Sequence, residues 1–453
     1  MTQSKFRFAS ALTSAGWQHD VAVTVDESGM IESVEAGAKG GGLVNGIAVP
    51  AVPNVHSHAH QRLMVGLAER AGPGADSFWT WREVMYGFAL KLSPDDLEAV
   101  AAQAYVEMLK AGFSCVGEFQ YLHHQPDGTP YDEPAEMSLR CLSAAEQVGI
   151  AITMLPTLYN YSGFGGQAST AGQRRFVNDA DRFLRIYGTL RGVTAAEPLR
   201  RLGISPHSLR AVTPELLNAV LSEIGTESRI HMHLAEQMKE VDDCLAWCGQ
   251  RPVEFLRSKF DVSGRWCAIH ATHMTEDETS WLARSGVIAG LCPTTEANLG
   301  DGVFPADIFM RHGGTIAIGS DSQITISPAE DLRMLEYSQR LRDRTRNALA
   351  SGAGASTGRT LFDAAVKGGA ACLDQPMGSI EVGKRCDIVV LDDDYGFMIG
   401  RSGDTALDAW IFSSGNAAVK DVIVGGAHVV KDRKHFDEDR IQKRFKKTVR
   451  HLS

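Results

Sequence analysis

The feature that most constrains the fold is an alternation of short apolar, strand-like runs with amphipathic helices through the middle of the chain. This alternation is typical of repeated βα units with parallel strands. We count eight such runs, the number that closes into a barrel. The predicted strands span residues 48–58, 114–121, 150–159, 203–209, 229–236, 267–273, 286–293 and 315–321. We therefore predict an α/β fold built on a (β/α)8 TIM barrel.

Capping residues mark where the intervening helices begin. A Ser or Thr before a helix accepts hydrogen bonds from its first free N–H groups, and Pro suits the first turn. The predicted helix starts are Ser93, Thr213, Thr275 and Ser327, and the helix after Ser93 is predicted to end at Gly112.

The two ends of the chain have a different pattern from its middle. Residues 21–34 and 421–430 alternate as strand, turn, strand, and residues 378–392 add a further strand-like run. The chain has 453 residues, enough for a barrel of about 250 residues and an accessory domain. We expect residues 1–48 and 376–453 to form one small β-sandwich, with the barrel between them at 49–375.

The net charge and the hydropathy of the sequence limit the classes of molecule that the protein can bind. The formal net charge is -10, from 45 basic and 55 acidic side chains, which argues against nonspecific binding to nucleic acid or an anionic membrane. A small anionic ligand stays possible, because a pocket can be locally basic. The first residues lack a signal-like apolar run, and no window approaches the ~20 apolar residues of a membrane span. We expect a cytoplasmic protein.

Polar residues gather at the carboxyl ends of the predicted strands, where barrel enzymes place their active sites. His56 and His58 lie two apart on the first strand and therefore point to the same face. Other strands end at His233, at His270 and at Asp321. For any one of them alone, a core histidine or a loop-capping aspartate is the better interpretation. Their conjunction predicts that several of them hold a metal ion.

The whole set resembles the amidohydrolase superfamily, in the branch that deaminates carbon-nitrogen double bonds. The resemblance implies that His56, His58, His233 and Asp321 are metal ligands, and that His270 and Glu236 are catalytic together with Asp321. The fourth predicted strand, GISPHSLR, has no lysine to bridge two metals. We therefore expect one metal ion per chain. Three imidazoles and a carboxylate suit Zn2+, although Fe2+ and Mn2+ can use the same donors.

Longer phrases narrow the resemblance. PNVHSHAHQRLMVGLAE, DSFWTWRE, PHSLRAV, HLAEQMKEVDDC and TEANLGDG are similar to the N-formimino-L-glutamate deiminases of bacterial histidine degradation. This similarity implies a small dicarboxylate substrate and a homodimer. It also implies that Arg210 grips a carboxylate, for which its planar fork is suited. The remaining residues that it assigns to substrate binding are Arg82, Tyr121, Gln61 and His207. His60 departs from the Phe that the resemblance leads us to expect.

In the implied mechanism, water activated by the metal loses a proton to His270 and attacks the formimino carbon, while Glu236 orients the nitrogen and delivers a proton so that ammonia leaves. Asp321 can also relay protons. His273 is interpreted as structural, because the pattern needs a single His on that strand.

Several alternatives remain open from the sequence. Arg82 could stack on Trp79 or Trp81 as a surface cation. Tyr121 and Gln61 could serve packing, and TEANLGDG could be a rim loop or a tight turn. At the level of function, one rival is a deaminase of an aromatic base such as guanine or a substituted adenosine. The other is a catalytically silent, metal-stabilised barrel that binds a ligand or partner.

Overall fold

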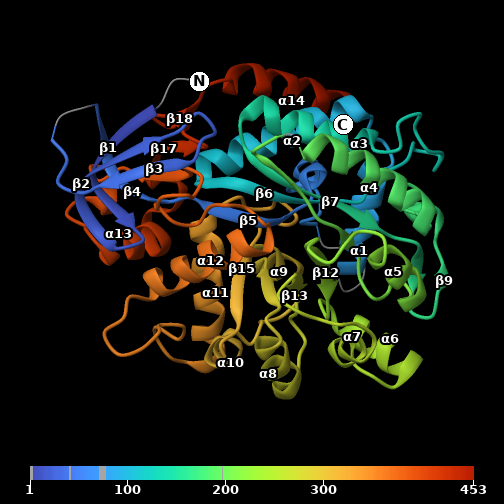
Figure 1. Cartoon of the computed structure of the whole chain (residues 1–453). Coiled ribbons are helices and arrows are strands. Elements are labelled where there is room, and N and C mark those ends of the chain that lie inside the picture. Colours follow the sequence, from blue (N-terminus) through green and yellow to red (C-terminus); the bar gives the residue numbers. More distant parts are fainter. Residues whose placement is uncertain (1–3, 40–41, 71–77, 196, 453) are drawn as a thin grey trace.

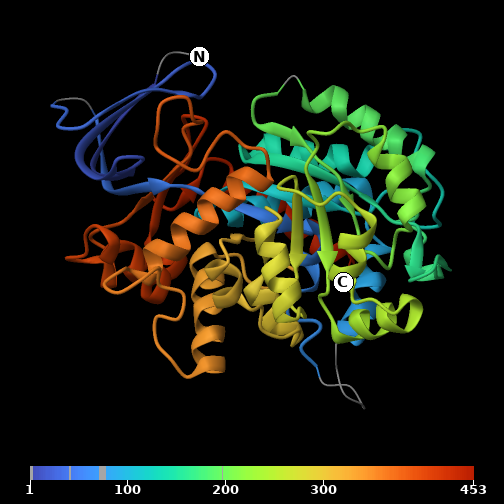
Figure 2. The same ribbon diagram turned by 60° about the horizontal axis from the view of Figure 1, so that its bottom comes forward.

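The computed structural model describes residues 4–39, 42–70, 78–195 and 197–452 (Figure 1). Asp76 and Ser77, which begin the DSFWTWRE phrase, lie outside these ranges. Parallel strands occupy the centre and helices surround them in both views (Figure 1, Figure 2). The barrel strands are β5 (Val52–Ser57), β6 (Phe113–Gln120), β7 (Ala151–Leu158), β11 (Ser205–Pro206), β12 (Ile230–Leu234), β13 (Trp266–His270), β14 (Ile288–Leu291) and β15 (Thr315–Ile318).

Isolated bridges close these strands into a ring. β5, β6, β7 and β11 pair in that order, and β12 to β15 form a second run. The bridges Ile204 to Ile230 and Ser208 to His233 join the runs on one side, and Ser57 to Asp321 joins them on the other. The predicted (β/α)8 barrel is confirmed. Its fourth strand is broken, because β10 (Arg200–Leu202) and β11 pair separately with β7.

Strands from both termini form a second sheet beside the barrel, as predicted. Blue N-terminal and orange to red C-terminal strands lie side by side in Figure 1, and the sheet order is β19-β18-β17-β16-β4-β1-β2-β3. Its strands are β1 (Ser4–Thr13), β2 (Gly16–Val25), β3 (Ile31–Glu35), β4 (Leu43–Pro50), β16 (Ile388–Leu391), β17 (Val419–Val424), β18 (Ala427–Lys431) and β19 (Lys434–His435). The domain limits at residues 48 and 375 stay predictions.

The predicted strand at 48–58 is wrong as one element. Residues up to Pro50 belong to β4 and pair with β16, whereas the barrel strand begins at Val52. Between them, the Ala51 N–H donates to the Asp387 carbonyl at 3.0 Å. The apolar run predicts one strand, although Pro50 and Pro53 flank the passage and a proline within such a run is a signal against a continuous strand.

The predicted helix starts are confirmed. Ser93, Thr213, Thr275 and Ser327 each accept a backbone N–H at the start of a helix, and Gly112 ends the first of these with a φ of 104°. The helices are α1 (Phe78–Ala89), α2 (Pro94–Ala111), α3 (Glu136–Val148), α4 (Ala180–Thr194), α5 (Pro214–Leu221), α6 (Met238–Cys248), α7 (Pro252–Lys259), α8 (Glu276–Arg284), α9 (Pro293–Leu299), α10 (Ala306–Arg311), α11 (Pro328–Asp343), α12 (Thr357–Cys372), α13 (Asp404–Ala409) and α14 (Glu438–Leu452). Among the helices described, none has the length and apolar character to cross a bilayer.

The two sheets are tied together by a buried ion pair. Arg385 Nη2 lies 2.7 Å from Asp387 Oδ2, with both side chains almost inaccessible to solvent. Asp387 also accepts from Ser114 Oγ on β6 at 3.1 Å, so the pair connects the terminal sheet to the barrel. A separate apolar cluster, which includes Phe8 and Ile388, packs within the terminal sheet.

Candidate active site

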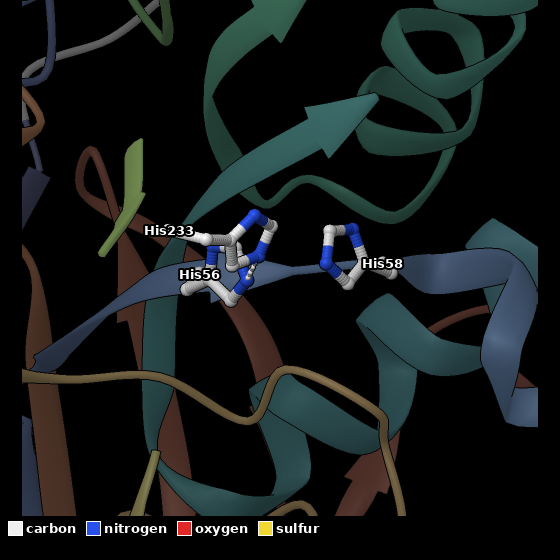
Figure 3. Close-up of side chains that lie close together, drawn as sticks. All are labelled: His56, His58 and His233. Carbon is white, nitrogen blue, oxygen red and sulfur yellow. Dashed lines mark hydrogen bonds between the residues drawn. The ribbon is translucent and has the colours of Figure 1, made fainter. Parts of the chain in front are cut away.

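Four predicted metal ligands converge at the carboxyl ends of the barrel strands. His56 on β5, His58 directly after β5 and His233 on β12 point toward one another (Figure 3). Asp321 follows β15, and its Oδ1 lies 3.3 Å from His56 Nε2 and 3.4 Å from His58 Nε2. His233 Nε2 is 3.1 Å from His56 Nε2. Three imidazole nitrogens and a carboxylate oxygen therefore face one small volume.

The hydrogen bonds of the Nδ1 atoms of His58 and His233 show that Nε2 is the ring nitrogen left free to bind a metal ion. His58 Nδ1 lies 2.9 Å from the Phe119 carbonyl, and His233 Nδ1 lies 2.9 Å from the His207 carbonyl. A carbonyl only accepts, so each Nδ1 carries the hydrogen and each Nε2 presents a lone pair inward. Burial lowers the pKa of all three imidazoles, which keeps them neutral. This donor set fits a divalent metal ion.

His270 and Glu236 lie beside the proposed ligands. His270 Nε2 is 3.8 Å from Glu236 Oε1 and 3.8 Å from Asp321 Oδ2. Burial raises the pKa of Glu236 to about 7, against the opposing charge of His270. Burial lowers the pKa of His270, but the neighbouring carboxylates outweigh it and raise the value to about 10. A carboxyl with a pKa near neutrality is able to donate a proton at physiological pH.

Two residues outside the prediction hold the strand ends in place. Glu118, fully buried on β6, accepts from Ser57 Oγ at 2.6 Å and from the Ala59 N–H at 2.8 Å, on either side of His58. Gln323 donates to Ser57 Oγ at 3.0 Å and to the Asp321 carbonyl at 2.9 Å. The β5 and β15 ends are thus fastened to each other. A Glu inside the apolar β6 run was the available signal for Glu118.

A pocket opens from the proposed metal ligands toward solvent. Its wall contains every predicted site residue except His56, which is fully buried. The structure adds the aromatic side chains of Tyr86, Tyr159 and Phe176, which the sequence did not single out, and places Trp81 in the same wall. Leu299, at the end of α9, also lines the pocket.

The TEANLGDG segment therefore reaches the pocket as a helix end, and the prediction of a loop or tight turn is wrong up to Leu299. Pro293 stands in the first turn of α9, and the helix ends at Gly300, where φ is 70°. The Cys292 N–H donates to Glu296 at 2.9 Å and so is satisfied at the helix start.

Two arginines face the pocket from different elements. Arg82 on α1 stacks over Trp79 at 4.5 Å and over Tyr86 at 5.4 Å. Arg210, after β11, lies 3.7 Å from Glu240, a buried residue that sequence reasoning missed. Within the described part of the chain, Nε of Arg82 and Nε of Arg210 are buried without a hydrogen-bond partner. Such groups are costly unless a ligand satisfies them.

The other predicted substrate residues form a hydrogen-bonded chain near His58. Gln61 Nε2 donates to Tyr121 Oη at 2.9 Å, and Tyr121 Oη lies 2.9 Å from His60 Nε2. His60 thus orients Tyr121 from behind the pocket, and burial keeps its pKa well below the usual value. His207 packs edge to face on Tyr159, with ring centroids 4.7 Å apart.

Comparison with known proteins identifies the family. Residues 47–429 match the amidohydrolase family. The chain is 48% identical over 437 residues to a formimidoylglutamate deiminase of Pseudomonas aeruginosa, with 96% of each chain covered. It is 25% identical to a 5-methylthioadenosine/S-adenosylhomocysteine deaminase of Shouchella clausii, over 96% of this chain and 95% of that one.

Solved structures agree with this assignment. An amidohydrolase from Brucella melitensis has a TM-score of 0.94 and 46% identity, covering 99% of this chain and 100% of that one. A zinc-bound adenosine deaminase from Xanthomonas campestris has a TM-score of 0.82 at 22% identity, covering 99% and 98%, and supports the fold alone. From its sequence and its fold together, this chain belongs to the amidohydrolase family.

Proposed function

We propose that this protein is a metal-dependent deiminase that hydrolyses the formimino C=N bond of N-formimino-L-glutamate, releasing ammonia and N-formyl-L-glutamate. The observation that carries the proposal is one pocket lined by two chemically different sets of side chains. Histidine nitrogens, Asp321 and Glu236 form one set, and Arg82 and Arg210 face the pocket from other elements. The relative that is 48% identical is a formimidoylglutamate deiminase.

The proposed metal ligands are His56, His58, His233 and Asp321, holding one Zn2+ per chain. A bound divalent ion lowers the pKa of water toward ~7 and so supplies hydroxide at neutral pH. Zinc is favoured by the neutral imidazoles and by the zinc in the Xanthomonas campestris structure. The chain's own contribution is to present free Nε2 lone pairs in a fixed arrangement, because the Nδ1 atoms of His58 and His233 donate to backbone carbonyls.

Proton transfer falls to residues that flank these ligands. With a divalent ion on the neighbouring ligands, its positive charge would oppose the carboxylates that raise the pKa of His270, so that His270 Nε2 can accept a proton from the attacking water. Asp321 beside it stabilises the charge that forms. As the formimino carbon becomes tetrahedral, Glu236 donates a proton to its terminal nitrogen, which becomes an amino group. The proton taken up by His270 then passes to the same nitrogen, the C–N bond breaks to release ammonia, and the hydroxyl proton returns to Glu236 as the formyl C=O bond forms. The C–N bond to the glutamate nitrogen stays intact, so the second product is N-formyl-L-glutamate.

Arg210 and Arg82 would bind the substrate carboxylates. Each has a buried Nε–H that lacks a hydrogen-bond partner among the described residues, and a substrate carboxylate would supply the acceptor. Gln61, Tyr121 and His207 complete the proposed contacts. We further infer that the enzyme acts in the cytoplasm as a homodimer in histidine degradation, as its resemblance implies. Light scattering tests the dimer.

A deaminase of an aromatic base is the second candidate, favoured by the aromatic wall of Trp81, Tyr86, Tyr159 and Phe176. Ammonia release at equal metal loading separates the two. We expect efficient turnover of N-formimino-L-glutamate, much weaker turnover of a formimino compound without the carboxylates, and little or none of guanine or adenosine. Efficient deamination of a purine would favour the second candidate, and silence on every compound would leave a ligand-binding barrel.

A further inference from the structure

His270 has a carboxylate partner that the proposed reaction does not use. Its Nδ1 lies 3.2 Å from Oε1 of Glu296, on α9, while its Nε2 faces Glu236 and Asp321. We propose that Glu296 is a positioning residue that keeps a hydrogen on His270 Nδ1, so that Nε2 is the atom left to accept a proton in the reaction. The proposal rests on the role given to His270 in the proposed function.

The chemistry of the two side chains sets the direction of the hydrogen bond between His270 and Glu296. A carboxylate only accepts hydrogen bonds, so a neutral imidazole facing Glu296 must carry its hydrogen on Nδ1. In the neutral ring, Nε2 then holds a lone pair. With the opposite tautomer, Nδ1 and the carboxylate would meet as two acceptors, and Nε2 could not take up a proton. A carboxylate that orients a catalytic histidine in this way has a large effect on turnover in other hydrolases.

Glu296 is itself held in place. It is buried, and its Oε1 also accepts the Cys292 backbone N–H at 2.9 Å at the start of α9. Cys292 lies close to both side chains, but burial raises the pKa of its thiol well above the usual value, which makes it a neutral neighbour. The carboxylate is therefore the only anion in this cluster of three residues.

The backbone and a neighbouring ring hold His270 in place. His270 and Ala271 have φ values of 68° and 48°, in the left-handed region that non-glycine residues seldom adopt. The His270 ring is stacked against that of His233, at 5.5 Å between centroids and 12° between planes. With Glu296 on Nδ1 and His233 on its face, the imidazole is restrained in orientation as well as in tautomer.

Glu296→Gln tests the proposal, with Glu278→Gln as its matched control. Glu278 is also buried and accepts a backbone N–H, from Thr275 at 2.8 Å, but it pairs with Arg251 and not with His270. In Glu296→Gln, the new side-chain amide can donate to Nδ1 and favour the wrong tautomer. We expect kcat to fall by ~10^2 in this variant, with KM within about twofold and unchanged metal content. Glu278→Gln should keep kcat within about twofold, whatever its stability.

A measurement on the unaltered enzyme keeps the test independent of folding. In metal-loaded protein with 15N-labelled histidine, the signals absent from His270→Asn belong to His270, and we expect Nδ1 to carry a proton and Nε2 to carry none. A bare Nδ1, or a Glu296→Gln enzyme with wild-type kcat, would overturn the proposal. If the wild type does not release ammonia from N-formimino-L-glutamate, the proposed function fails, whereas the nitrogen signals still report whether Glu296 sets the tautomer.

Discussion

The carboxyl end of the barrel and the junction with the terminal sheet both contain buried charges, but they satisfy them differently. At the junction, Arg385 and Asp387 pair closely and make further hydrogen bonds. In the site, Arg210 and Glu240 lie 3.7 Å apart, and both Nε of Arg210 and Oε2 of Glu240 lack a hydrogen-bond partner in the described structure.

Left-handed backbone conformations occur in both regions, but those of the terminal sheet, at Asp20, Asp432 and Arg433, are exposed or half-buried, whereas those of the site are buried. Ala235, His270, Ala271, Asp321 and Gln323 all have φ between 45° and 68°, and all lie at the carboxyl ends of barrel strands. Unsatisfied groups and strained residues persist only where the surrounding structure holds them, and they are typical of functional sites. The comparison teaches that the junction and the sheet cores stabilise the fold, whereas the strand ends are arranged for a ligand. Substitutions at the strand ends should therefore lower activity more than stability. Substitutions at the junction and in the sheet cores should lower stability more than activity.

Removal of the metal should have the largest effect. Exhaustive chelation should abolish ammonia release, because the bound ion is what lowers the pKa of water far enough to supply hydroxide at neutral pH, and added Zn2+ should restore it. Elemental analysis of the active protein should find one tightly held divalent ion per chain. Two tightly held ions per chain would contradict the mononuclear site.

The proton-transfer residues come next. Glu236→Gln and His270→Asn should each lower kcat by ~10^2 or more, because general acid and base groups usually contribute that much. Metal content should stay near normal, because neither residue is among the four proposed metal ligands. Wild-type kcat in either variant would remove that residue from the mechanism.

The pH dependence follows from the same assignment. Glu236 must be protonated to donate, and its pKa is raised to about 7, so kcat should decline as pH rises above that value. The decline should be about tenfold per pH unit once the carboxyl is mostly ionised. Glu236→Gln should lack this alkaline decline, as measured by its residual kcat from pH 6 to 9.

Loss of the Arg210 guanidinium should weaken mainly substrate binding. Arg210→Met should lower kcat/KM by ~10^2, mostly through KM, because two charge-assisted hydrogen bonds to a carboxylate are lost. The substitution also leaves Glu240 buried without its partner, so Arg210→Lys serves as the control that keeps a charge. An Arg210→Met enzyme with unchanged kcat/KM would show that the carboxylate binds elsewhere.

The smallest effect on catalysis is expected in the terminal sheet. Ile388 is fully buried in its apolar cluster, and Ile388→Ala should lower the free energy of unfolding by about 2 to 5 kcal/mol. Urea unfolding measures this loss, while kcat and KM should stay within about twofold. A large loss of kcat with intact folding would show that the two regions are coupled.

The sequence predicted most of the fold because its signals are local. Capping residues such as Ser93 and Thr275 act within one helical turn, and strand-like runs are read from a few neighbouring residues. The passage from β4 to β5 at Ala51 was missed, since what separates them is the choice of partner strand, which lies far away in the chain. The helical form of residues 295–299 was missed because Gly and Asn suggest a turn, whereas Pro293 and the contact from Glu296 to Cys292 start a helix.

The site could be predicted as far as a family pattern reaches. His56, His58, His233, Glu236, His270 and Asp321 were named from such a pattern, and their proximity is a property of the folded barrel. Glu118, Glu240 and Glu296 were not named, because each acts on a neighbour that is distant in sequence or lies on another element. Their partners become visible only in three dimensions.

The identity of the bond that breaks is the central claim, and the fate of oxygen and nitrogen tests it most directly. Turnover of N-formimino-L-glutamate in water enriched in 18O should yield one ammonia and one N-formyl-L-glutamate per substrate, with a single 18O atom in the formyl group by mass spectrometry. That result follows if water adds to the formimino carbon and the terminal nitrogen leaves. Formation of formamide and free glutamate instead would mean that the other C–N bond breaks, and would contradict the account.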